Sequence, residues 1–176
     1  ALLSDSTNAE SPGTTPSERV VDAAFEQVFR EAPGRIIVAT FASLISRVQQ
    51  VINAAARHNR KLAIAGHSMS ENARIAQNLG YLDLPPGILV TMNEVSQLLP
   101  RETVLMVTGA QGEPSSVLAR MSTGQYGPIR VTKGDTVIVS THPIPGNEEM
   151  IHRTINRLFQ RGAEVLQRKG VPNYPH

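Results

Sequence analysis

The strongest constraint on this sequence is an alternation between short runs of β-branched and aliphatic residues and longer segments whose apolar residues recur at helical spacing. The first apolar run lies at 35–40 (R-I-I-V-A-T), and a helical pattern follows at 44–58. Such alternation predicts parallel β-α units, and therefore a three-layer α/β/α domain with a mostly parallel, Rossmann-like sheet. The other elements are expected as helices at 17–32, 70–79, 92–99, 115–121 and 147–161, and as strands at 61–65, 88–90, 103–107, 136–139 and 164–166.

Length and composition limit the kinds of site that this fold can carry. The 176 residues, 40% of them hydrophobic, suffice for one core and predict a single domain over 1–176. The absence of cysteine excludes a disulfide scaffold, a thiolate zinc site and a cysteine nucleophile. The histidines show no close ligand spacing, so we expect no metal site within this chain. They are His58, His67, His142, His152 and His176.

The charge pattern favours contacts to phosphate or carboxylate only weakly. The formal net charge is +2, and only three of the 17 basic residues are lysines. Arginine suits bidentate contacts to phosphate and carboxylate groups. The sequence has no signal-peptide pattern and no apolar run of about 18 residues. We therefore expect a cytoplasmic protein that does not bind membranes.

Polar residues and glycines follow four of the predicted strands. These exit segments are 40–43 (T-F-A-S), 66–70 (G-H-S-M-S), 108–114 (T-G-A-Q-G-E-P) and 140–148 (S-T-H-P-I-P-G-N-E). Ligands of parallel sheets bind beyond the carboxyl ends of the strands, and helix N-termini favour anions. Helix capping and tight turns explain the polar residues and glycines of any one exit. The four exits together predict a polar, anion-binding rim. No dinucleotide fingerprint, Walker loop or nucleophile elbow is present in the sequence.

A second set of motifs runs through nearly the whole chain in a fixed order. The motifs are L-S-D-S-T-N-A-E at 3–10, T-P-S-E at 15–18, T-F-A-S at 40–43 with R-V at 47–48, G-H-S-M at 66–69, L-G-Y-L at 79–82, T-G-A-Q-G-E-P at 108–114 with L-A-R-M at 118–121, G-D-T-V-I at 134–138, and P-I-P-G-N-E at 143–148. In these motifs the chain resembles the β-CASP domain of ribonuclease J, in the metallo-β-lactamase-fold nucleases.

The resemblance implies a larger enzyme in which the β-CASP domain is inserted into a metallo-β-lactamase domain. The ligands of two catalytic zinc ions are then expected before Ala1 and after His176, with 1–10 and 168–176 as junctions to that absent domain. The implied activity is zinc-dependent hydrolysis of RNA, both endonucleolytic and 5′-to-3′ exonucleolytic. Asp5 matches the first β-CASP motif, which implies a catalytic role in proton transfer. The chain alone is expected to be inactive and to bind RNA weakly at most.

The resemblance and the polar rim together predict that this domain grips single-stranded RNA by its phosphates. Arg47 lies one helical turn past Ser43 and is expected on the same phosphate track. Three positions depart from the usual family pattern. His67 replaces an arginine and Ala110 replaces a serine, and both changes are expected to weaken phosphate contacts. The segment 44–46 (L-I-S) also differs from the residues usual there. The predicted contacts are Thr40, Ser43, Arg47, His67, Ser68, Gln111, Gly112, Glu113, Ser140, Thr141, Gly146, Asn147 and His176.

Two other functions fit the same sequence. A free-standing α/β domain would bind a nucleotide or a phosphorylated metabolite at the rim. An interaction scaffold would assemble with other proteins or with itself, and the resemblance also admits a homo-oligomer of the full-length form. The scaffold predicts an exposed apolar patch, and the nucleotide-binding domain predicts micromolar binding of a mononucleotide.

Overall fold

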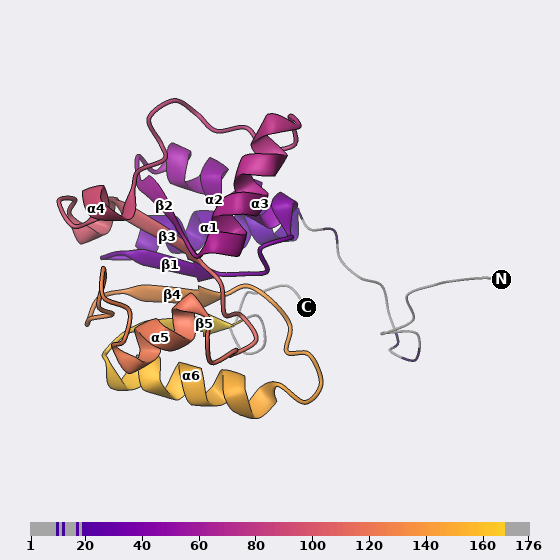
Figure 1. Cartoon of the computed structure of the whole chain (residues 1–176), viewed down its shortest axis with the longest axis vertical. Helices are drawn as coiled ribbons and strands as arrows, with labels where there is room; N and C mark the ends of the chain where they lie inside the picture. The colour runs from indigo at the N-terminus through magenta and orange to yellow at the C-terminus, as the bar shows by residue number, and fades with distance from the viewer. Residues whose placement is uncertain (1–9, 11, 13–16, 18, 168–176) are drawn as a thin grey trace.

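The computed structural model describes residues 10, 12, 17 and 19–167 (Figure 1). Within them, five strands form one sheet in the order β2-β3-β1-β4-β5, and every neighbouring pair is parallel. The predicted three-layer α/β/α fold is confirmed. The strands are β1 (Ile36–Ala39), β2 (Lys61–Ala65), β3 (Thr103–Val107), β4 (Thr136–Val139) and β5 (Glu164–Gln167).

Helices cover both faces of the sheet, as Figure 1 shows. On one face, α1 (Val20–Glu31), α2 (Ile45–Arg57) and α3 (His67–Asn78) pack on a core that includes Ile36 and Val38 of β1. On the other face, α5 (Val117–Thr123) and α6 (Glu148–Gln160) pack on a core that includes Ile37 and Ala39. Every β1 residue is therefore buried, which explains why its sequence is continuously apolar rather than alternating.

Two predicted elements between β2 and β3 differ in the structure. The strand expected at 88–90 is wrong, because only an isolated parallel bridge between Leu62 and Leu89 forms there. The preceding Pro85-Pro86-Gly87 keeps the chain from pairing over a longer stretch. The helix expected at 92–99 is the shorter α4 (Met92–Val95), and a 3₁₀ turn, η1 (Pro100–Glu102), leads into β3.

A third difference moves two candidate residues onto a helix. The helix expected from residue 70 begins at His67, so His67 and Ser68 lie in the first turn of α3. Gly66 has a φ of +114°, a conformation that side-chain-bearing residues rarely adopt, and the chain therefore turns from β2 into α3 within one residue. Both side chains are exposed.

The strand order determines where a crevice can open at the carboxyl edge. From β1 and β2 the chain leaves towards α2 and α3 on one face, whereas from β3 and β4 it leaves towards α5 and α6 on the other. Because β3 lies between β2 and β1, and β4 lies beside β1, neighbouring strands send their chains in opposite directions on both sides of β3 and again between β1 and β4. Such switch points are where ligands bind in open α/β sheets.

The C-terminal end of α1 depends on a buried arginine. Arg60 is 7% exposed, and its guanidinium donates hydrogen bonds to the carbonyl oxygens of Gly34 (2.7 Å), Ala32 (2.9 Å) and Phe29 (3.2 Å). Burial lowers the pKa of Arg60. Near it, the exposed Arg57 pairs with Glu26 on the surface.

We predict that Arg60→Met lowers the free energy of unfolding by about 3 kcal/mol, because three buried carbonyl groups lose their donor. Arg57→Met is the matched control and should change it by less than about 1 kcal/mol, as expected for an exposed ion pair. Urea unfolding of the two variants measures the difference. Equal losses would contradict this account of Arg60.

Candidate nucleic-acid interface

A cleft of about 520 Å³ lies at the carboxyl ends of β1, β2 and β3, at the switch points on either side of β3. Three of the four predicted exits meet there, so Thr40, His67, Ser68 and Glu113 lie around one hollow. The lining residues are Thr40, Phe41, Ala42, Gly66, His67, Ser68, Thr108, Gly109, Glu113, Ser115, Ser116, Val117 and Arg120.

Thr40 is the least satisfied polar side chain of the cleft. It is 1% exposed, and its Oγ1 has no hydrogen-bond partner among the described residues. The same is true of only one other buried side-chain oxygen in that part of the chain, Oγ1 of Thr136, which lies at the opposite, amino edge of the sheet. A buried hydroxyl without a partner costs free energy, so Thr40 is poised for a hydrogen bond to a group bound in the cleft.

The N-terminus of α3 opens on the same cleft. Its N-cap residue is Gly66, which supplies no side-chain hydrogen bond, and His67 and Ser68 form the first turn. The first N–H groups of a helix lack partners within the helix and carry partial positive charge, which favours an anion. Across the cleft, by contrast, the hydroxyl of Ser116 accepts a hydrogen bond from the Ala119 N–H and caps α5.

Close backbone packing shapes the far wall of the cleft. Gly109 has a φ of +114°, and a Cβ atom there would lie 2.8 Å from Cβ of Ser116 and 2.9 Å from Cβ of Leu118. Only glycine therefore lets the chain leaving β3 approach the start of α5 so closely. Thr108 Oγ1 accepts a hydrogen bond from the Val117 N–H at 3.3 Å and fixes the same turn.

Ionic groups contribute little net charge to the cleft. Glu113 and Arg120 line it with opposite formal charges, and His67 carries charge only when it is protonated. Glu113 accepts a hydrogen bond from the backbone N–H of Gln111 at 3.2 Å, and the Arg120 guanidinium lies 5.4 Å from the centroid of the Tyr126 ring. The attraction of this cleft for an anion therefore depends mainly on N–H and O–H donors.

Four lining residues with polar side chains were not among the predicted contacts, namely Thr108, Ser115, Ser116 and Arg120. One signal for Thr108 was present in the sequence. Ala39 pairs with Val107, so Thr40 and Thr108 are the first residues after the paired ends of neighbouring strands. Arg120 gave no such signal, because its position depends on how α5 packs over the exit of β3.

Gln111 connects the exit of β3 to the exit of β4 from inside the protein. It is 2% exposed, and its Nε2 donates to the carbonyl oxygen of His142 (2.8 Å) and to Oγ1 of Thr141 (3.0 Å). Its Oε1 accepts from the Ile144 N–H (2.8 Å) and from Nδ2 of Asn147 (3.4 Å). The structure thus brings together three predicted contacts, Gln111, Thr141 and Asn147. The side chain of Gln111 points towards the loop after β4.

Gly112 holds the loop after β3 against α6. Its φ is +75°, and a Cβ atom there would lie 2.7 Å from the backbone nitrogen of Ile151. The loop backbone therefore touches the backbone of the helix. Gly146, by contrast, is exposed, and its N–H donates to Oε2 of Glu148 at 2.7 Å.

Arg47 fills the switch point between β1 and β4. It is 2% exposed, and its guanidinium donates to Oγ of Ser140 and to the Ser140 carbonyl oxygen (3.1 Å). Its Nε donates to Oε1 of Gln50 (2.9 Å), and the guanidinium lies 5.9 Å from the centroid of the Phe25 ring. The structure therefore adds an internal role for Arg47, holding the exit of β4 against α2.

The sequence model of the family described as "Ribonuclease J, beta-CASP domain" matches residues 33–158, a range that contains the cleft and the Arg47 and Gln111 contacts. The chain belongs to this family. The resemblance seen in the motifs is thereby confirmed.

Curated relatives match almost all of this β-CASP chain. It is 47% identical over 165 residues to ribonuclease J of Thermus thermophilus, covering 94% of this chain and 29% of the relative. It is 42% identical over 168 residues to ribonuclease J of Synechocystis, covering 96% and 26%, and 39% identical over 166 residues to ribonuclease J2 of Bacillus subtilis, covering 94% and 30%. The chain spans less than a third of the length of these relatives.

Neither a metal cluster nor a membrane span is found in the part of the chain that the structure describes. No group of three or more His, Cys, Asp or Glu residues there is arranged to hold a metal ion. No helix of residues 19–167 is both long enough and apolar enough to cross a membrane. Asp5 and His176, the predicted catalytic acid and terminal contact, lie outside the described residues.

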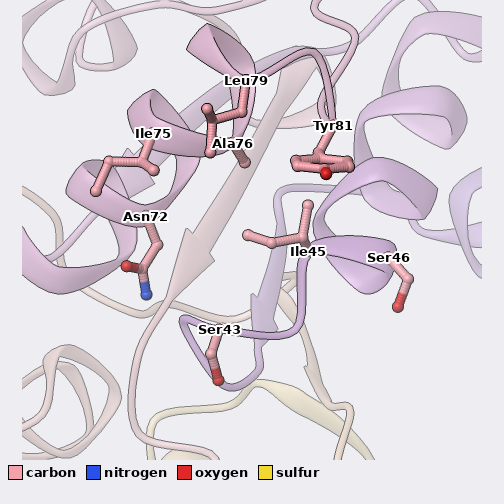
Figure 2. Close-up of a pocket in the computed structure, with 8 residues that line it drawn as sticks. All are labelled: Ser43, Ile45, Ser46, Asn72, Ile75, Ala76, Leu79 and Tyr81. Atoms are coloured by element: carbon pink, nitrogen blue, oxygen red, sulfur yellow. The ribbon is translucent and has the colours of Figure 1, made fainter.

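An apolar groove of similar volume, about 520 Å³, lies beside the cleft of the β-CASP domain. Figure 2 shows Ile75 and Ala76 of α3 around this groove, with Ile45 of α2 and with Leu79 and Tyr81, which follow α3. Ser43, predicted as a phosphate contact, lines this groove and not the cleft. The groove offers few donors to an anion, so the cleft is the candidate interface.

We predict that Gln111→Ala lowers the free energy of unfolding by about 2 kcal/mol, because Thr141, Ile144 and Asn147 lose hydrogen bonds in a buried site. Backbone amides of 141–147 should exchange hydrogen faster than in the parent protein. Hydrogen-exchange mass spectrometry checks this, with Gln97→Ala, an exposed glutamine elsewhere, as control. Unchanged exchange over 141–147 would show that Gln111 does not hold this loop.

Proposed function

We propose that this β-CASP domain grips the phosphate backbone of single-stranded RNA in the cleft at the exits of β1, β2 and β3. The observation that carries the proposal is the buried, unpartnered hydroxyl of Thr40 beside the uncapped N-terminus of α3. Hydroxyl groups and helix N-termini contact phosphate oxygens without reading bases. His67 and Ser68 extend this donor set at the exposed end of the cleft.

In the full-length protein, we propose, this domain serves a ribonuclease J-like hydrolase. The relatives named ribonuclease J support this assignment, and most of their length lies outside the present chain. Two zinc ions on a metallo-β-lactamase domain outside this chain would supply activated water for endonucleolytic and 5′-to-3′ exonucleolytic cleavage. In the proposal, 1–176 is one β-CASP domain, joined to the metal domain through 1–10 and 168–176, and Asp5 supports proton transfer.

Most of the predicted contacts divide into two groups in this proposal. Thr40, His67 and Ser68 line the cleft and contact phosphate directly. Glu113 repels phosphate and instead accepts a hydrogen bond from a ribose hydroxyl, a group that distinguishes RNA from DNA. Residues of the second group hold the exits in place from inside: Arg47, Gln111, Gly112, Ser140, Thr141 and Asn147.

The other proposed attributes stay predictions. A homo-oligomer of the full-length form and a cytoplasmic location follow from the family resemblance and the sequence pattern. A free-standing domain that binds a nucleotide or phosphorylated metabolite would use the same cleft. Micromolar binding of a mononucleotide with no affinity for RNA would favour that function, and so would a gene that encodes no His-x-His-x-Asp-His motif upstream.

We predict that Thr40→Val in the full-length protein weakens single-stranded RNA binding roughly fivefold, which corresponds to one hydrogen bond of about 1 kcal/mol. Stability should not fall, because this hydroxyl has no partner among the described residues. Thr136→Val is the matched control: it removes the other unpartnered hydroxyl at the opposite edge and should leave RNA affinity unchanged. Fluorescence anisotropy measures both affinities. An equal loss of RNA affinity in the two variants would contradict the proposal.

We also predict that the purified 176-residue chain shows no metal-dependent RNA cleavage and at most weak RNA binding. Its described residues offer no metal cluster, and its formal net charge is only +2. The assay incubates labelled RNA with the chain and added Zn²⁺ or Mn²⁺, after circular dichroism has established that the chain is folded. Cleavage that a chelator abolishes would overturn this assignment.

A further inference from the structure

A second polar hollow lies between α5 and α6, on the face of the sheet away from α2 and α3. Its volume is about 250 Å³. Thr154 and Ala119, both buried, lie among its lining residues, and the exposed arginines of α6 lie at its edge. The lining residues are Gly112, Pro114, Ala119, Thr123, Gln125, Met150, Arg153, Thr154 and Arg157.

The charged groups of this hollow are all cations. Arg153 and Arg157 line it, one helical turn apart on α6, and no carboxylate does. Arg153 donates to Oε1 of Glu149 at 2.6 Å on the exposed helix surface. The side chain of Arg157 makes no hydrogen bond or ion pair within the described part of the chain, so its guanidinium is available to a ligand.

The hollow and the strand-exit cleft lie on opposite sides of one ridge. In the loop after β3, Glu113 lines the cleft while Gly112 and Pro114 line the hollow. In α5, similarly, Val117 and Arg120 line the cleft, whereas Ala119 and Thr123 line the hollow. A flexible polyanion that leaves the cleft over this ridge therefore reaches Arg153 and Arg157 next.

We infer that the α5–α6 hollow binds a phosphate of the same RNA strand, outside the cleft. Guanidinium groups donate to phosphate oxygens with matched, planar geometry, and the side-chain amide of Gln125 lies in the same lining as a further donor. The inference rests on the proposed RNA-binding function and extends the footprint of the strand from the cleft to α6. The inference requires that long RNA strands gain affinity from the arginines of α6 and that short RNA strands do not.

The experiment uses the full-length protein with single-stranded RNA of two lengths, about 4 and about 20 nucleotides, spanning the site sizes common among single-strand binding folds. Arg153→Gln combined with Arg157→Gln should weaken binding of the long RNA roughly tenfold at low salt. The slope of log Kd against log salt should fall by about 0.7, since one phosphate contact in a single strand contributes about that much. Affinity for the short RNA should not change. Binding is measured on ice, with the RNA checked for cleavage on a gel.

The matched control is Arg30→Gln combined with Arg101→Gln, which removes the same charge from two exposed arginines away from both hollows. Equal loss of affinity in both double variants would overturn the inference, because net charge alone would then explain it. Unchanged binding of the long RNA would overturn it too. The same holds if polyglutamate displaces the short RNA and the long RNA to the same extent. If the unaltered protein binds neither RNA, the proposed function fails instead.

Discussion

The position of β1 at the centre of the parallel sheet sets the arrangement of every polar group in this domain. Ala39, the last residue of β1, pairs with Val107 of β3 on one side and with Val139 of β4 on the other. The residues that follow these three strand ends are Thr40, Thr108 and Ser140, and the shared register brings them to one level of the sheet. Two of the switch points flank β1 at that level, so each hydroxyl-bearing exit starts beside a potential crevice.

The two crevices differ because a side chain fills only one of them. Between β1 and β4, the Arg47 guanidinium donates to Ser140 and lies near the Phe25 ring. Burying this charge costs free energy, which the donated hydrogen bonds offset. Beside β3, no comparable side chain of the described residues reaches across, and the cleft remains with Thr40 in its wall. The closed crevice holds the exit of β4 rigidly, and Gln111 extends that rigidity to the loop after β3. A binding surface whose supports are already fixed loses less entropy when a ligand binds.

Sequence patterns predicted the layers and the exits but not the way in which the exits combine. A strand followed by hydroxyl residues and glycine is a local pattern, so the segments 40–43 and 108–114 were recognised directly. Strand order is not local, because it depends on which apolar faces pack together. It is the order β2-β3-β1-β4-β5 that unites three exits in a cleft and leaves the fourth bonded to Gln111. Arg47 did leave a helical signal: it precedes Val51 by four residues and Ala54 by seven, and both are buried on α2. The helical spacing therefore indicated the buried position that Arg47 has on α2.

The charge distribution implies that the cleft and the α5–α6 hollow respond differently to salt. Contacts from N–H and O–H groups replace no counterions, whereas each arginine contact to phosphate does. In the cleft, the charge of Arg120 is offset by Glu113, so binding there depends on donors such as Thr40 and the start of α3. In the hollow no carboxylate is part of the lining, and Glu149 pairs with Arg153 but not with Arg157. Rising ionic strength should therefore release a strand from α6 before it weakens the hold of the cleft, and the length of RNA in contact with this domain would shorten as salt increases.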